Sequence, residues 1–409
     1  MTRVLTFLAA TLAVAGSQPT WRAHVESLKA RGDAAAALKV LDQIPSTAAT
    51  EDEKGFLLAV LNRREEAVRH FRKAISLNPN YAPAAYHLGV ALWLESTREE
   101  ALGYLRNSTL IAPKKFDYRY RYGQALAELD RNKDAAAEFR AAAALRPAHA
   151  DVWYRLGLAA QRAGDRANAV SAYAKALRLK PDNLDARNNH GFVLVELGQP
   201  AKGLEEFNKV LAVEPRNVAA LSNIGFALLQ KGDNGAAILQ YRKALEVSPD
   251  SAPLHYNLGL ALKQNDELEA AKTYLRRAIE LDASLVEAHY TLGITHWQAG
   301  EFADAEREMR AAAGKNPNHA EAFAMLGTVL KQQGKVDEAM LALHEAIRLD
   351  GELPGPHTLL AQILRARGDH EGSRREFASA ARAKARKEQE QKIMFDRSAI
   401  EGVGARRVR

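Results

Sequence analysis

Cysteine is absent from this 409-residue chain. Its absence excludes disulfide bonds, thiolate metal sites, a cysteine nucleophile and lipid attachment to an N-terminal cysteine. The sequence also contains no phosphate-binding glycine loop, no HExxH motif, no nucleophile elbow and no metal-spaced Cys/His cluster. These absences leave no motif that would support catalysis, so we expect a protein that is not an enzyme and binds no cofactor or metal.

Net charge is small over most of the chain. The formal charge is +7, but residues 382–409 contribute +5 and Arg3 adds one more, which leaves +1 for residues 4–381. A nearly neutral body carries no electrostatic footprint for nucleic acid. The basic C-terminal segment, 388–409, reads as a solvated cap and tail, with an arm for an anionic partner as the alternative. We expect its last ten residues to be disordered.

The N-terminus has the layout of a secretory signal. Arg3 precedes an apolar run at residues 4–15, which ends in Ala-Val-Ala before Gly16. The run is too short for a transmembrane helix, which needs about 20 residues. We therefore expect a signal peptide at 1–15, cleavage after Ala15, and an exported protein that is periplasmic or secreted. An uncleaved membrane anchor and an N-terminal capping helix are the alternatives.

A strict period organises the rest of the chain. Nine glycines recur every 34 residues: Gly55, Gly89, Gly123, Gly157, Gly191, Gly225, Gly259, Gly293 and Gly327. With this glycine counted as position 8 of a repeat, ten repeats of 34 residues fill 48–387, and Ala361 replaces the glycine in the last. A fixed period of this size indicates stacked repeats, each of which buries its apolar face only against its neighbours.

Other positions of the repeat are equally regular. Position 20 is small, and position 24 is large in every repeat: Phe71, Leu105, Phe139, Tyr173, Phe207, Tyr241, Leu275, Met309, Leu343 and Phe377. Position 15 is often glycine, which suits a turn, and position 32 is proline in seven repeats, which suits the end of a helix. Because a glycine inside a helix costs about 1 kcal/mol relative to alanine, we expect the large residue at position 24 to pack where a Cβ at position 8 would clash.

This pattern resembles the tetratricopeptide repeat family. The resemblance covers nearly all of the chain after the signal segment, and it implies an all-α, right-handed superhelical solenoid of about ten to eleven helix-turn-helix repeats with a C-terminal capping helix. Residues 18–47 fit a degenerate first repeat whose linker is four residues short. Glu51 and Lys54 stand at positions 4 and 7, which are usually apolar, so they put the local geometry of repeat 48–81 in doubt.

The resemblance also implies a binding surface. In this family, positions 2, 5, 6, 9, 12 and 13 of the first helices line a concave groove. The candidate peptide-binding residues here occupy positions 5, 6 and 13: Tyr86, Tyr120, Tyr154, Tyr256 and Tyr290; Arg121, Arg155, Asn189, Asn223 and Asn257; Gln230, Gln264, Gln298 and Gln332. The asparagines are similar to the asparagine ladder of O-linked N-acetylglucosamine transferases, without their catalytic domain, but asparagine at position 6 is also common across the family.

Two other binding modes are disfavoured. Co-chaperone repeats that clamp a C-terminal carboxylate use lysine at position 2, where this chain has acidic residues such as Asp117 and Asp151. These acids are spaced to form i,i+4 pairs with Arg121 and Arg155, which would partly neutralise the arginines. The histidines His255, His289 and His357 share position 4 and His296 occupies position 11. We interpret these four histidines as packing residues, not as metal ligands.

The sequence therefore predicts a non-catalytic scaffold or adaptor that binds protein segments in its groove, with no nucleic acid, small-molecule substrate or stable membrane span. The alternative is an accessory subunit of a cell-envelope glycan or polysaccharide enzyme system.

Overall fold

The computed structural model describes residues 20–94 and 97–404, with side chains through residue 390. The predicted signal segment 1–15 lies outside these residues. Within them the chain forms helices and no strand. The all-α helix-turn-helix solenoid expected from the sequence is confirmed.

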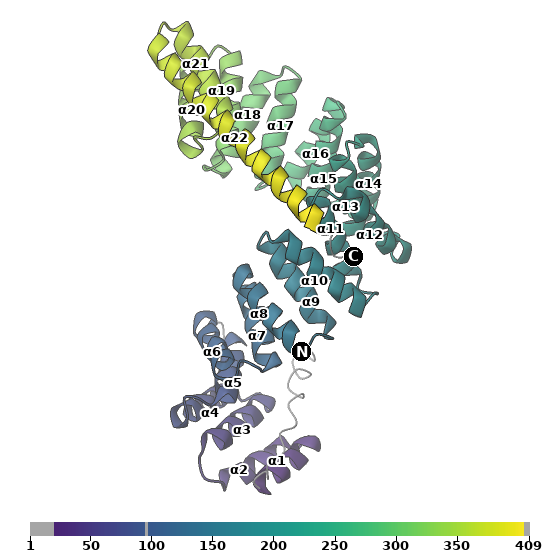
Figure 1. Ribbon diagram of the computed structural model, residues 1–409, viewed down its shortest axis with the longest axis vertical. Coiled ribbons are helices and arrows are strands. Elements are labelled where there is room, and N and C mark those ends of the chain that lie inside the picture. Colours follow the sequence, from purple (N-terminus) through teal and green to yellow (C-terminus); the bar gives the residue numbers. More distant parts are fainter. Residues whose placement is uncertain (1–19, 95–96, 405–409) are drawn as a thin grey trace. The chain divides into compact units, whose positions relative to one another are not determined.

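The chain divides into two compact units, one ending at Val193 and the other beginning at Leu194, inside α11 (Leu184–Glu196). In the N-terminal unit, helices alternate between first and second members of each pair (Figure 1): α1 (Thr20–Ala30), α2 (Ala34–Asp42), α3 (Ala48–Val60), α4 (Arg64–Leu77), α5 (Ala82–Leu94), α6 (Arg98–Ile111), α7 (Phe116–Glu128), α8 (Asn132–Leu145), α9 (Ala150–Arg162) and α10 (Arg166–Leu179).

The C-terminal unit continues the alternation with α12 (Pro200–Val213), α13 (Val218–Gln230), α14 (Asn234–Val247), α15 (Ala252–Gln264), α16 (Leu268–Leu281), α17 (Val286–Gln298), α18 (Phe302–Lys315), α19 (Ala320–Gln332), α20 (Val336–Leu349), α21 (Pro354–Ala366) and α22 (His370–Gly404). Since α22 continues to Gly404, the disorder expected for the last ten residues is wrong for residues 400–404. Residues 405–409 lie outside the described part of the chain.

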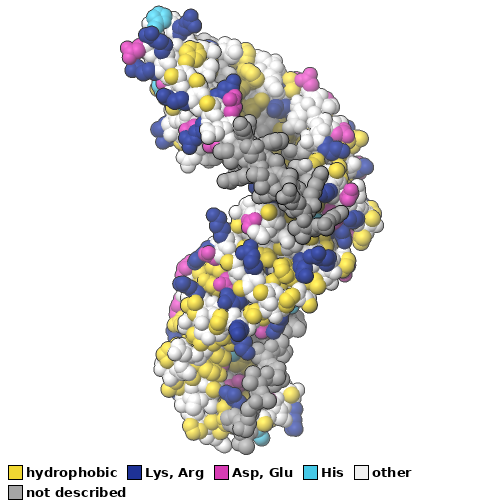
Figure 2. All heavy atoms as spheres, in the orientation of Figure 1, with side chains coloured by type: hydrophobic (Ala, Val, Ile, Leu, Met, Phe, Trp, Pro, Cys, Tyr) yellow, Lys and Arg dark blue, Asp and Glu magenta, His cyan; other side chains and the backbone are white. Residues whose placement is uncertain are grey.

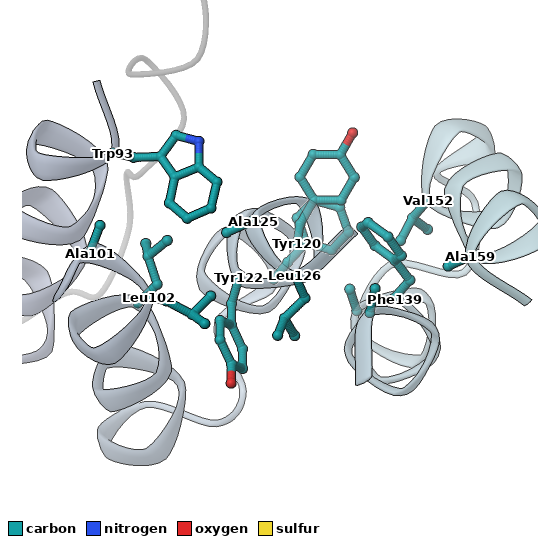
Figure 3. Packing of buried hydrophobic residues seen from close by; sticks show 14 of the residues in the cluster. Trp93, Ala101, Leu102, Tyr120, Tyr122, Ala125, Leu126, Phe139, Val152 and Ala159 are labelled. Atoms are coloured by element: carbon teal, nitrogen blue, oxygen red, sulfur yellow. The ribbon is translucent and has the colours of Figure 1, made fainter. Parts of the chain in front are cut away.

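Size matching between positions 8 and 24 closes each helix pair. A Cβ built on Gly157 would lie 2.5 Å from the Tyr173 ring, and one on Gly123 would lie 2.9 Å from the Phe139 ring. Figure 3 shows Phe139 of α8 lying between Tyr120 of α7 and Val152 of α9. The helical glycines therefore serve close approach, as predicted, because real Cβ atoms do not come this near to a neighbour.

The turn between paired helices requires a left-handed residue at position 15. Gly164 has φ +77°, and where glycine is missing Asn62, Asp130 and Asp266 adopt φ of 61°, 55° and 64°. Asparagine and aspartate tolerate this conformation better than other residues with a Cβ. The predicted turn position is confirmed.

Proline at position 32 is not needed to end the second helix. Helix α16 stops at Leu281 and its cap, Asp282, is extended, although position 32 there is Ala283. The bond that recurs at this place comes from the next repeat. The side chain at position 4 donates to the main-chain oxygen at position 32, six residues earlier, in five repeats: Arg119 to Pro113 at 2.7 Å, Trp153 to Pro147 at 2.9 Å, Arg187 to Pro181 at 2.7 Å, His255 to Pro249 at 2.8 Å and His357 to Gly351 at 3.2 Å.

Repeat 48–81 is regular despite its polar core positions. Glu51 is 1% exposed, and its carboxylate accepts from Ser46 Oγ at 2.5 Å and Lys73 Nζ at 2.9 Å and bonds His70 Nδ1 at 2.7 Å. Lys54 pairs with Asp42 at 2.9 Å. The doubt that the sequence raised about this repeat is therefore resolved, because these side chains find partners in the preceding linker and in α4.

Charged side chains of both signs are interspersed over the face shown in Figure 2. Among the described helices, none is long and apolar enough to cross a membrane.

Candidate functional site

In the N-terminal unit, Arg155 is held by its own unit. Its Nε donates to Asp151 Oδ2 at 2.9 Å and to the Tyr120 hydroxyl at 2.6 Å, and the Tyr120 hydroxyl also bonds Asp151. Burial and the Asp151 carboxylate raise the pKa of Tyr120 above its usual range. The predicted Asp151–Arg155 pair is confirmed, and it belongs to a three-residue network that links α7 to α9.

The predicted pair of Asp117 with Arg121 is wrong. Arg121 meets Glu128 at 3.5 Å and lies over the Trp93 ring at 5.4 Å, and Glu128 also accepts from Trp93 Nε1 at 2.8 Å. Asp117 meets Arg146 at 3.4 Å instead. Partners from α5 and α8 win because they approach from neighbouring helices, which an i,i+4 rule within one helix does not consider.

Tyr154 and Asn189 are half-buried and both lie at Tyr173. The Tyr154 and Tyr173 ring centroids are 6.1 Å apart, and the Asn189 side chain hydrogen-bonds Tyr173, whose hydroxyl donates to Gln161 at 2.7 Å. Burial raises the pKa of Tyr154, and the Asp185 carboxylate adds to the effect. Asn189 thus supports packing between repeats.

Between α7 and α9 the N-terminal unit has a hollow of about 200 Å³. Its walls come from position 9, 12 or 13 of α7 and position 6, 9, 10 or 13 of α9, together with two residues of α8: Gln124, Ala127, Glu128, Arg155, Leu158, Ala159, Arg162, Asn132 and Phe139. The hollow therefore lies along the groove positions that the resemblance implied.

In the C-terminal unit the candidates on α15 are less engaged. Tyr256 and Asn257 are half-buried, and neither side chain has a hydrogen-bond partner among the described residues. Tyr290 on α17 packs its ring 4.9 Å from His319, and burial raises its pKa. Asn223 on α13 is half-buried and takes part in an interaction within the protein.

The four glutamines occupy one structural place. Each is the last residue of a first helix and each is exposed: Gln230 of α13, Gln264 of α15, Gln298 of α17 and Gln332 of α19. Helix α17 packs against both α15 and α19. Three of these amides therefore stand on adjacent helices, and the side chains of all four make no hydrogen bond within the described chain.

The four histidines that share repeat positions have protein partners. His289 Nδ1 bonds Glu308 at 2.8 Å, His357 Nδ1 bonds Glu376 at 2.6 Å, and His296 bonds Glu301. His296, Glu301 and Asp304 lie close enough to hold a cation. However, the Lys272 ammonium already meets Glu301 at 2.7 Å and Arg307 meets Asp304 at 2.5 Å, so positive charge is supplied by the protein itself.

Sequence reasoning missed the residues at position 12 of the C-terminal unit. Lys263, Trp297 and Lys331 occupy it in successive first helices and are half-buried. Reading that position through the repeats, as was done for position 13, would have found them.

Comparison with known proteins agrees with the helix-pair architecture. Tetratricopeptide repeat profiles match residues 55–108, 290–354, 252–285 and 354–379, and the profile of the cytochrome c-type biogenesis protein H TPR domain matches 136–255. No curated protein sequence matches significantly.

Similar solved structures include three described here. MamA is 28% identical, with 39% of this chain and 94% of that chain covered and a TM-score of 0.37. The APC/C hetero-tetramer Cut9–Hcn1 is 13% identical over 88% and 86%, with a TM-score of 0.49. PilF of Pseudomonas aeruginosa is 23% identical over 53% and 97%, with a TM-score of 0.46.

The profile matches fall on the stretches where paired helices, left-handed turns and glycine-to-large packing recur with one period. The chain belongs to the tetratricopeptide repeat family.

Proposed function

We propose that this protein is a non-catalytic scaffold that binds an extended segment of a partner protein along the first helices of its C-terminal unit. Tetratricopeptide arrays support protein interaction in general. The observation that carries the finer proposal is the contrast between the two units. Arg121, Arg155 and Asn189 are engaged inside the N-terminal unit, whereas Asn257, Tyr256 and the four glutamines have no hydrogen-bond partner in the described chain.

Uncommitted amides suit a peptide main chain. Each glutamine or asparagine side chain offers one acceptor and two donors, so it can pair with both main-chain groups of an extended segment. A hydrogen bond contributes about 0.5–1.5 kcal/mol net, so the amides alone give modest affinity. Tyrosine adds apolar contact area at low entropic cost. Tyr256 and Tyr290 supply that area on α15 and α17.

A site-specific cross-link tests this surface. With a photo-reactive residue at Gln298, we expect the full-length protein to capture a partner in its native cell. With the same residue at Leu341, which is 71% exposed on the second helix α20, we expect none. Adding Tyr256→Ala and Asn257→Ala should reduce the cross-link from position 298, by roughly 10-fold in affinity.

Equal capture from both positions, or capture from 341 alone, would contradict binding along the first helices. The captured protein also decides between the two functional candidates. A glycan or polysaccharide enzyme would assign the accessory-subunit alternative, and any other protein favours the general scaffold. Asn189 is left unchanged in these variants because its bond to Tyr173 would mix binding with stability.

We further propose that the protein acts after export. The support is the layout of residues 1–20, with Arg3 before the apolar run and small residues before Gly16. Intact mass measurement of the protein purified from its native cell should give a chain that begins at Gly16. A chain that begins at Met1 or Thr2 would rule out cleavage.

A further inference from the structure

Position 12 of three neighbouring first helices forms a row in the C-terminal unit. Lys263 lies on α15, Trp297 on α17 and Lys331 on α19. Because α17 packs against both α15 and α19, the three side chains follow one another along the stack. Each is half-buried, and each is followed by one of the uncommitted glutamines.

The two lysines differ from the other basic residues around them. Of the lysines and arginines in residues 194–390, Lys263, Lys272 and Lys331 are the ones that are at least half-buried. Lys272 meets two carboxylates, Glu269 at 2.6 Å and Glu301 at 2.7 Å. Within the described chain Lys263 meets no carboxylate, and the Lys331 ammonium donates to the Gln362 side chain at 3.0 Å.

A half-buried ammonium without a counter-ion is unfavourable in the free protein. Burial disfavours the charged form, and it lowers the pKa of Lys263 with no carboxylate to offset it. A carboxylate supplied by a ligand would remove this cost and would form a charge-assisted hydrogen bond. The row is therefore complementary to negative charge at two places.

Trp297 separates the two lysines. The indole N–H groups of Trp93 and Trp153 donate at 2.8 Å to Glu128 and 2.9 Å to the Pro147 oxygen, but that of Trp297 has no partner in the described chain. A half-exposed indole with a free N–H can cover an apolar side chain and bond a main-chain oxygen together.

We propose that Lys263, Trp297 and Lys331 bind an acidic, extended peptide segment that carries one carboxylate for each lysine and an apolar residue between them for Trp297. Neighbouring helices lie about 8–10 Å apart, so the lysines are separated by roughly 16–20 Å. An extended chain advances about 3.3 Å per residue, which places the two acidic residues roughly five to six positions apart. This inference rests on the proposed function and names the chemistry of its partner.

The surroundings favour a peptide over a nucleic acid, whose phosphates would also meet lysines. Glu287 and Glu321 lie in the first turns of α17 and α19, on the same helices as the row. Their carboxylates would repel a continuous phosphate backbone, but not an uncharged main chain. The glutamines beside the row offer both donors and acceptors, as a peptide main chain requires.

Fluorescence anisotropy with the full-length protein tests the proposal. The probes are labelled peptides with a central leucine and two glutamates spaced four to seven residues apart, the same peptides with glutamine for glutamate, and a single-stranded oligothymidine. We expect the glutamate peptides to bind at least 10-fold more tightly than the glutamine peptides, with the tightest binding at a spacing of five or six. We also expect weaker binding as salt rises.

Matched variants locate the contact. Lys263→Met and Lys331→Met should each weaken the glutamate peptide by about 10-fold and leave the glutamine peptide unchanged. Lys315→Met removes the same charge from an exposed position at the end of α18 and should change neither. Trp297→Ala should weaken both peptides. Circular dichroism of each variant shows whether it remains folded.

Each outcome decides. Equal affinity for glutamate and glutamine peptides overturns the acidic preference while leaving the proposed function intact. Tighter binding of the oligothymidine assigns the row to nucleic acid and overturns the peptide. If no peptide binds, the acidic inference falls. The proposed function falls with it only when the cross-link at Gln298 also captures nothing.

Discussion

Gly157→Leu is expected to lower the stability of the N-terminal unit by about 3 kcal/mol, through overpacking. Even a Cβ at this place would lie 2.5 Å from Tyr173 Cε1 and 2.6 Å from Cδ1. Tyr173 is fully buried, and its hydroxyl is held by Gln161 at 2.7 Å and by Asn189. The ring cannot swing away without breaking these bonds. Gly157→Ala should still cost about 1–2 kcal/mol, although alanine gains about 1 kcal/mol in helix propensity.

Gly293→Ala is the matched control. A Cβ there would meet Met309 Cε at 2.7 Å, which is the far end of a flexible side chain. Methionine can adopt another rotamer at small cost, so the change should stay within about 1 kcal/mol of the original stability. Urea unfolding, with hydrogen exchange of α9 and α10 as the local readout, measures both. If the two alanine variants were equally stable, rigid ring contact would not be what selects glycine.

Glu51→Gln is expected to destabilise the first repeats by about 2–3 kcal/mol at neutral pH. Burial opposes ionisation of Glu51, but hydrogen bonds from Ser46, Lys73 and His70 outweigh it and lower the pKa of its carboxyl from 4.5 to about 2. The native pKa lies below the unfolded one, so the stabilisation is fully present above pH 4.5. It is lost progressively as the pH falls toward 2. The difference between the two proteins should therefore vanish in acid.

Hydrogen exchange of residues 20–77 at pH 7 and at low pH, corrected for the intrinsic exchange rates, measures this effect. Glu66→Gln serves as the control because Glu66 is a half-exposed carboxylate that pairs with Arg63 in the same helix. Such surface pairs contribute about 0–1 kcal/mol. A Glu51→Gln variant that protects these amides as well as the original protein at pH 7 would contradict a stabilising carboxylate at this core position.

The period carried most of the fold. Repeats of 34 residues, the turn at position 15 and the pairing of Gly157 with Tyr173 followed from spacing and side-chain size. Glu51 did not, because a carboxylate at an apolar position looks like a defect until its partners are known. Those partners, Ser46, His70 and Lys73, come from other elements, and no period brings them to notice.

The candidate surface was predictable by position but not by state. The repeat register placed Arg121, Arg155 and Asn257 at one position of their helices. Whether such a side chain is engaged depends on residues about one repeat away, such as Tyr120 for Arg155 and Trp93 for the Glu128 partner of Arg121. The unpaired lysines at position 12 could be recognised only after the carboxylate neighbours of every other cation were known.

The bond from position 4 to the main-chain oxygen six residues earlier has a practical consequence for shortening the protein. A fragment that starts at the first residue of α7 retains the Arg119 guanidinium and discards the Pro113 oxygen that accepts from it. Expression fragments should therefore begin at the end of the preceding second helix, so that the connecting segment stays with the repeat that follows it.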